Sequence, residues 1–258
     1  MQNPRLTGPY CGSFHSRPRG NLSPRQRDRD TLGAMRITKF THSCVRVEKH
    51  GSVLVLDPGN FSSPEEIREA LEGAEYLMVT HEHPDHYFRE PVHEVLNDHT
   101  DIQVYATQSA ADELRESVKN PEHIHSVQGE EEFDVGPFGI RTFGGQHALI
   151  HPLIPTIQNV GFMIDDDVYH PGDSLIVPHH ITVKHLLLPI HAPWNKLQEV
   201  VDFLASVRPQ RAFPIHDGLM AENGHAMLTK HLENFGTKYG SEYVRLRPGD
   251  SLNLEETS

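Results

Sequence analysis

The stretch that decides the fold is Tyr76-Leu77-Met78-Val79-Thr80-His81-Glu82-His83-Pro84-Asp85-His86. A short apolar run that suits a buried strand is followed by three histidines and an aspartate within six residues. His81 and His83 are two positions apart, so both imidazoles point the same way where the backbone is extended. Pro84 stiffens the turn before Asp85 and His86. Imidazole and carboxylate are ligands that divalent metals such as zinc prefer, so the stretch predicts a strand followed by a metal-binding loop.

Four other segments also carry a histidine or aspartate at or just after the end of a predicted strand. These segments are Leu54-Val55-Leu56-Asp57-Pro58-Gly59, Gly144-Gly145-Gln146-His147, His170-Pro171-Gly172-Asp173 and Pro214-Ile215-His216-Asp217-Gly218. Loops at strand ends are where α/β proteins place their chemistry, and the neighbouring glycines allow tight turns. His151 is the competitor of His147 and Asp217 the rival of His216; the Gly144-Gly145 turn favours His147.

The composition limits the class of protein. The chain has 258 residues, with 36 acidic and 23 basic ones, and its net charge of −13 argues against a nucleic-acid partner. Two cysteines are too few for a disulfide framework. No run of 18 apolar residues predicts a membrane span, and no apolar core near the N-terminus indicates a secretory signal. We therefore expect a cytoplasmic protein without a membrane partner.

Two parts of the chain differ in pattern. Residues 1–34 are rich in arginine and poor in apolar residues, so we predict a disordered N-terminal extension, with a basic arm for RNA as the alternative. Residues 35–258 are predicted to form a single domain. The predicted strands are residues 36–41, 44–48, 53–56, 76–80, 103–106, 123–127, 132–135, 139–143, 159–164, 167–170, 185–189, 211–214 and 243–247. The predicted helices are residues 64–71, 91–96, 109–118, 196–207 and 224–235, the first with Ser63 as N-cap and Glu66 as capping-box partner.

The loop from His81 to His86, directly after an apolar strand, resembles the metallo-β-lactamase fold superfamily, and the resemblance extends over about residues 35–250. Periodicity alone indicates only a mixed α/β chain. The resemblance implies more: an αββα sandwich of two mixed β-sheets with outer helices.

The resemblance also implies a centre for two divalent metal ions, zinc or manganese, with iron as the alternative. Its implied ligands are His81, His83 and His147 for the first metal, Asp85, His86 and His216 for the second, and Asp173 as a bridge. Such a set leaves positions open for a bridging water, from which two metals would supply hydroxide at neutral pH. Asp85 is also the predicted catalytic residue, because its carboxylate is available to orient that water or to protonate a leaving group.

Three more residues are candidates for supporting the site or contacting the substrate. Asp57 is expected to hold a histidine N–H or a loop amide rather than a metal. His42 falls at the superfamily's early histidine position, where contact with the substrate or a ligand and simple hairpin packing are equal alternatives. His191, with Trp194, lines a substrate pocket or has a structural role.

Several motifs are similar to the ascorbate-6-phosphate lactonase-like branch and related metal-dependent hydrolases. They are Thr41-His42-Ser43-Cys44, Asp57-Pro58-Gly59, His170-Pro171-Gly172-Asp173, Leu186-Leu187-Leu188-Pro189-Ile190 and Pro214-Ile215-His216-Asp217-Gly218. The resulting prediction is a binuclear hydrolase of a small ester, lactone or phosphoester. The alternatives are a non-catalytic metal- or ligand-binding protein on the same fold and a mononuclear iron dioxygenase. The partner is a small-molecule substrate, and the sequence leaves the oligomeric state open, a homo-oligomer included.

Overall fold

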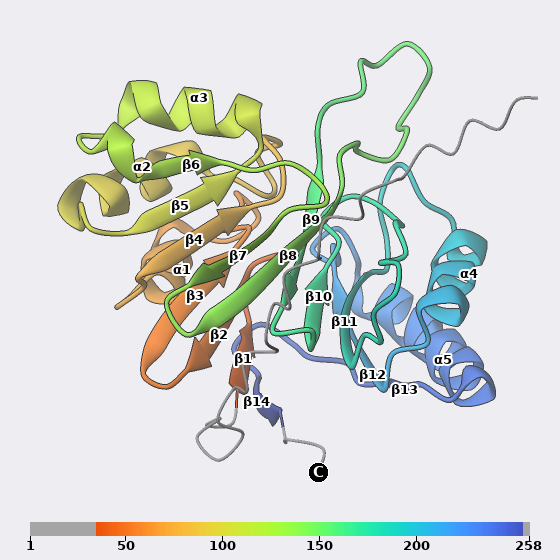
Figure 1. Cartoon of the computed structure of the whole chain (residues 1–258). Coiled ribbons are helices and arrows are strands. Elements are labelled where there is room, and N and C mark those ends of the chain that lie inside the picture. The colour runs from red at the N-terminus through yellow and green to blue at the C-terminus, as the bar shows by residue number, and fades with distance from the viewer. Residues whose placement is uncertain (1–34, 255–258) are drawn as a thin grey trace, which may run out of the picture. The chain divides into compact units, whose positions relative to one another are not determined.

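The computed structural model describes residues 35–254, and these residues contain two seven-stranded sheets. The first sheet consists of β1 (Met35–Lys39), β2 (Val45–Lys49), β3 (Ser52–Leu56), β4 (Tyr76–Val79), β5 (Gln103–Ala106), β6 (Ile124–Ser126) and β14 (Ser251–Leu254). Its strand order is β14-β1-β2-β3-β4-β5-β6, and β3 to β6 run parallel (Figure 1). The long connections needed between parallel strands contain α1 (Pro64–Ala70), α2 (Arg89–Asp98), α3 (Gln108–Ser117) and the short 3-10 helix η2 (Pro121–His123).

The second sheet repeats this plan. It consists of β7 (Glu132–Val135), β8 (Phe138–Gly144), β9 (Val160–Ile164), β10 (Val168–His170), β11 (His185–Pro189), β12 (Arg211–Ile215) and β13 (Glu242–Tyr243). The order is β13-β12-β11-β10-β9-β8-β7, with β10 to β13 parallel. The helices α4 (Leu197–Val207) and α5 (Glu222–Tyr239) connect β11, β12 and β13.

Three apolar cores define four layers. In β3 and β4, Val55 and Leu77 pack toward α1–α3, whereas their neighbours Leu54 and Met78 pack between the two sheets. Burial on both faces explains why these strands are continuous apolar runs. A third core joins the second sheet to α4 and α5, through residues such as Phe203. The predicted αββα sandwich of two mixed sheets with outer helices is therefore confirmed (Figure 1).

Two local predictions need correction. The predicted strand over residues 243–247 is limited to β13, and the missed strand β14 pairs with β1 instead, Leu254 opposite Met35. Ser63 does cap α1 by accepting the Glu66 N–H, but the Glu66 carboxylate accepts hydrogen bonds from Thr41 N and Oγ1. A contact distant in sequence thus replaces the local half of the capping box.

The predicted extension, residues 1–34, lies outside the described residues. Within residues 35–254, no helix combines the length and the apolar character that a membrane span needs.

Candidate metal centre

The candidate ligands meet because they follow strands that point the same way. Asp57 ends β3 and the loop from His81 to His86 follows β4, while His147, Asp173 and His216 follow β8, β10 and β12. Since β3 and β4 are parallel, as are β10 and β12 through β11, these loops leave the same end of each sheet. This end of the sandwich is called the ligand edge below.

The ligand edge holds two clusters whose ligand-type atoms lie within 4.8 Å of one another. One contains His81, His83, His147 and Asp173; the other contains His42, Asp85, His86 and His216. Every implied metal ligand is therefore in one of the two clusters. His42 is added to the second, while His151 is exposed on the loop, where its Nδ1 accepts the Leu153 N–H.

Asp173 lies between the two clusters. Its Oδ2 is 3.2 Å from His147 Nε2 and 3.1 Å from His216 Nε2, and its Oδ1 is 2.9 Å from His86 Nε2. His147 belongs to the first cluster and the other two histidines to the second. Asp173 therefore contacts candidate ligands of both clusters.

The donor set fits metal ions because several of its buried atoms lack partners. Among the described residues, His81 Nε2 is a buried atom that makes no hydrogen bond, and the buried His86 Nε2 and Asp173 Oδ1 face each other at 2.9 Å without a hydrogen bond between them. Leaving such an atom unsatisfied costs about 1–3 kcal/mol, so a cluster of them aimed at one point indicates a ligand that satisfies them.

Hydrogen bonds on the opposite ring nitrogen fix the tautomers of the candidate ligands. The Nδ1 atoms of His147 and His216 face the backbone carbonyls of Ala148 and His191, at 2.6 and 2.7 Å. A carbonyl can only accept, so each Nδ1 carries a proton, and in the neutral ring the lone pair on Nε2 faces the centre. His86 Nδ1 likewise donates to Asp57 Oδ2, at 2.7 Å. These partners prepare Nε2 for metal binding.

His42 has the reverse tautomer. The Gly218 N–H donates to its Nδ1 at 3.0 Å, so the proton of the neutral ring is on Nε2, 3.2 Å from Asp85 Oδ2. His42 therefore donates to a candidate ligand and lacks the lone pair that a metal would need. Its ring also packs on Phe61, with ring centroids 4.5 Å apart. His42 therefore both contacts a candidate ligand and has a packing role.

Asp57 makes hydrogen bonds to residues that carry or hold the candidate ligands. Its buried carboxylate accepts the Thr80 N–H at 2.8 Å and the Thr80 hydroxyl at 2.7 Å, besides the His86 ring. Because the Thr80 hydroxyl proton goes to Asp57, its oxygen is free to accept from His81 Nδ1, 2.9 Å away. One carboxylate thereby orients a ligand in each cluster.

The backbone at the ligand edge is strained where the side chains must converge. His42, Asp57 and His216 have φ values of 61°, 47° and 55°, in the left-handed region that non-glycine residues rarely adopt. A Cβ on Gly59 would lie 1.7 Å from the Asp85 carbonyl oxygen, so only glycine allows these two loops to approach so closely.

Electrostatics keep the carboxylates charged. Burial alone would raise the pKa of Asp85, but hydrogen bonds from His216 and His42 hold it far below its usual value. Burial opposes protonation of His86 and His216, yet Asp173 raises both pKa values, that of His216 to about 9. Protons thus compensate the carboxylates where metal ions would otherwise do so.

Some supporting residues were not predicted from the sequence. Lys39, 1% exposed, donates to the His42 carbonyl at 2.6 Å and pairs with Asp217 at 3.2 Å, so it ties together two loops of the edge. Asn159 Oδ1 accepts the Asp173 N–H. The only signal for Lys39 is a lysine at a core-facing position of a strand pattern, and Asn159 has none.

The loop after β11 closes one side of the centre. His191 is exposed and contributes its carbonyl to His216, so its ring does not join the clusters. Trp194 is half-buried, and its indole Nε1–H donates to Asp173 Oδ2 at 2.8 Å. Its ring lies between those of His147 and His216, at 6.0 and 5.8 Å between centroids.

A two-sheet sandwich with paired His/Asp clusters at one end is the architecture of the metallo-β-lactamase superfamily. Residues 36–216, more than half of the chain, match the family model described as a beta-lactamase superfamily domain, and the chain belongs to this family. The predicted superfamily is confirmed, whereas the lactonase-like branch stays a prediction.

The chain is similar to several known proteins. Protein Rv0786c of Mycobacterium tuberculosis is 34% identical over 208 residues, which cover 79% of this chain and 93% of that protein. UPF0173 protein PF0020 of Pyrococcus furiosus is 26% identical over 209 residues, 77% of this chain and 91% of that protein. The solved structure of Igni18, a metallo hydrolase from Ignicoccus hospitalis, has a TM-score of 0.66 at 17% identity, over 87% of this chain and 100% of that one. At that identity the likeness concerns the fold.

Proposed function

We propose that the protein is a binuclear metal-dependent hydrolase of a small ester, lactone or phosphoester. The observation that carries the proposal is the pair of adjacent His/Asp clusters that both contact Asp173 and contain buried ligand atoms without a hydrogen bond. His81, His83 and His147 would hold one ion, and Asp85, His86 and His216 the other. Two such ions would activate water at neutral pH and stabilise the charge that develops on the attacked group.

Asp85 is the residue best placed for proton transfer. Its side chain is 23% exposed, compared with 3% for Asp173, so it is the carboxylate of the centre that solvent and substrate can reach. The His42 N–H holds its Oδ2, and this leaves Oδ1 to orient a water or to give a proton to the leaving group. We further propose a small-molecule substrate, no nucleic-acid partner and a cytoplasmic location.

Metal content is the decisive test. Protein purified without added metal should contain about two zinc or manganese ions per chain, and a panel of esters, lactones and phosphodiesters should be hydrolysed. One iron per chain would favour the mononuclear dioxygenase instead. Bound metal without turnover of any member of the panel would favour a non-catalytic binding protein.

A further inference from the structure

Exposed apolar side chains concentrate around the ligand edge. The large exposed hydrophobic residues among the described ones are Phe61, Leu149, Leu153, Ile154, Leu219, Met227 and Tyr239. Five of the seven lie on loops that carry candidate site residues, and a sixth, Met227, faces the same pocket as Leu219. The loop between β8 and β9, with three of them, projects beyond the sheets (Figure 1). Such gathering marks a binding surface, whereas scattered exposed residues do not.

A pocket of about 400 Å³ adjoins this edge. Most of its walls are apolar, and its lining includes Ile190, Leu197, Leu219, Met220, Met227 and Leu228. It lies next to the centre, because His191 lines it and the His191 carbonyl accepts from His216 Nδ1 at 2.7 Å. Leu219 is three residues beyond His216, so the two Cα atoms are at most about 11 Å apart.

The same loops are poor in cations. Residues 57–63, 80–89, 144–159, 170–183, 190–197 and 216–221 contain only Arg89 and Lys196 as basic residues. Arg89 pairs with Glu113, at 2.8 Å between Nη2 and Oε2, so Lys196 is the remaining one on these loops. Proteins that select phosphorylated substrates surround them with arginine and lysine.

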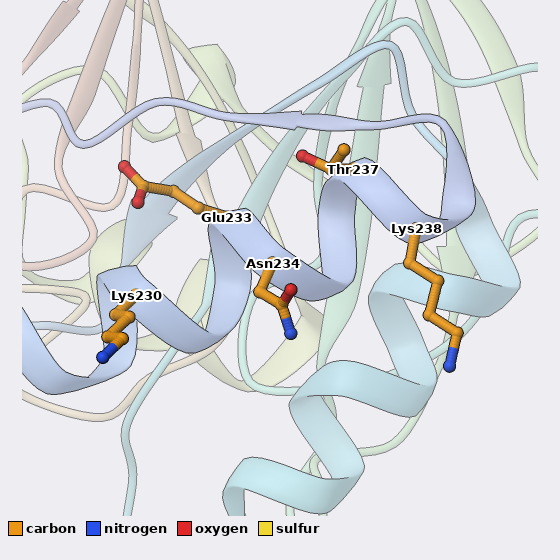
Figure 2. A pocket seen from close by; sticks show the side chains of 5 residues that line it. All are labelled: Lys230, Glu233, Asn234, Thr237 and Lys238. Atoms are coloured by element: carbon orange, nitrogen blue, oxygen red, sulfur yellow. The ribbon is translucent and has the colours of Figure 1, made fainter.

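A second groove on the surface is lined by polar side chains instead of apolar ones. The groove along the second half of α5 is lined by Lys230, Glu233, Asn234, Thr237 and Lys238 (Figure 2). Its lining is polar and holds a single carboxylate and no histidine. Compared with this groove, the apolar pocket beside the centre is the better suited to an apolar ligand.

We propose that the substrate is a carboxylic ester or lactone with an apolar chain, and that this chain lies in the pocket between residues 190–197 and the start of α5. The inference rests on the proposed function and narrows its substrate class. The reaction balances with water alone: the acyl C–O bond breaks, water supplies hydroxide to the acyl carbon and a proton to the leaving alkoxide.

The test compares p-nitrophenyl acetate, butyrate and octanoate with the metal-loaded full chain. Burial of a methylene predicts up to about fourfold higher kcat/KM per added CH₂. The double variant Leu219→Ser/Met227→Ser should flatten this rise, measured as the ratio of kcat/KM for octanoate to kcat/KM for acetate. Tyr239→Ser, an exposed apolar residue at the far end of α5, is the matched control and should keep the rise.

Some outcomes would overturn the inference while the hydrolase stands. One is a flat chain-length profile in the unaltered protein. Another is preference for bis-p-nitrophenyl phosphate together with loss of that activity in Lys196→Ala. A third is a flat profile with Leu219-dependent binding to phosphatidylcholine vesicles, which would assign the apolar residues to a membrane surface.

If the protein hydrolyses no ester, the binding of carboxylates still tests the pocket separately from the proposed function. Trp194 is the single tryptophan of the chain, and its contact with Asp173 makes its fluorescence a reporter of the centre. Without turnover of any ester, octanoate should still bind the metal-loaded protein more tightly than acetate, and Leu219→Ser/Met227→Ser should abolish the difference. Equal affinity for the two carboxylates would overturn the pocket assignment.

Discussion

The two ends of the sandwich carry the same residue types with opposite consequences. At the ligand edge, histidines and aspartates converge and leave buried atoms such as His81 Nε2 and Asp173 Oδ1 without a hydrogen bond. At the other end, where β11 and β12 begin, His185 donates from Nδ1 to Asp167 and accepts at Nε2 from Arg211 at 2.9 Å. Residue type is therefore not what separates a ligand set from a structural network.

A ligand set and a structural network differ in whether all of their buried polar atoms make hydrogen bonds. The network at the far end is complete: Lys49 there donates to Asp165 at 2.8 Å and to the Pro137 carbonyl at 2.9 Å. A complete network stabilises the fold and has no capacity for another ligand. The incomplete one retains lone pairs for a cation, and this predicts that substitutions at the two ends affect different properties.

The largest effect is expected from Asp173→Ala. Loss of the residue shared by both clusters should remove most bound metal and lower activity by about 10²–10³-fold or more, since metals contribute several kcal/mol to the reaction. Elemental analysis and ester hydrolysis measure the two effects. Asp167→Ala, at the far end, is the control and should keep its metal. Retention of metal and activity in Asp173→Ala would refute the ligand assignment.

Metal affinity should depend steeply on pH. The pKa of His216 is raised to about 9 in the metal-free fold, so its contribution to the free energy of unfolding is complete below pH 6.5 and is lost as pH rises toward 9. Metal binding displaces that proton, so affinity should rise through the same window, by up to about tenfold per pH unit for each proton released.

Chelator competition at pH 6.5, 7.5 and 8.5 measures the affinity, and urea unfolding of the metal-free protein measures its stability. The two should change in opposite directions as pH rises. An affinity that is constant over this range would mean that His216 is not a ligand.

A smaller effect is expected from Asp57→Asn. Asparagine has the same shape and tolerates the φ of 47°, but one carboxylate oxygen becomes an NH₂ group. This group faces a donor in either orientation, the Thr80 N–H on one side or the Thr80 hydroxyl and the His86 ring on the other. Metal affinity should fall about 10–100-fold because His86 loses its orienting partner. Chelator competition gives the dissociation constant, and circular dichroism checks that the fold is kept. An unchanged constant would show that Asp57 is not needed to hold the ring.

The strands and the loops that carry the candidate ligands have local signals in the sequence, whereas the αββα sandwich and the assignment of ligands to two metals came from the family resemblance. His147, Asp173 and His216 each follow an apolar run that ends in a turn, and both signals are local. Lys39 and its partner Asp217 are 178 residues apart, and β14 pairs with β1 across the whole domain. Such pairings have no local pattern, so these elements of the fold and of the site required the structure.

His42 illustrates the same limit within one residue. Its position in the motif drew attention to it, but its role depends on which ring nitrogen carries the proton. The Gly218 N–H decides that, from 176 residues away. The sequence therefore identifies which residues gather at the edge better than it identifies what each one donates or accepts.

The smallest effect is expected from His185→Ala at the far end. The substitution leaves Asp167 and Arg211 without the ring that joins them, and it should lower the free energy of unfolding by about 1–3 kcal/mol. Metal content and metal affinity should stay within twofold of the unaltered protein, because no candidate ligand contacts this network. Urea denaturation of the metal-loaded protein measures the first quantity and chelator competition the second. If His185→Ala instead released the metal, the two ends would be coupled through the strands. The unsatisfied atoms at the ligand edge could then no longer be interpreted as a metal site independently of the hydrogen-bond network at the far end.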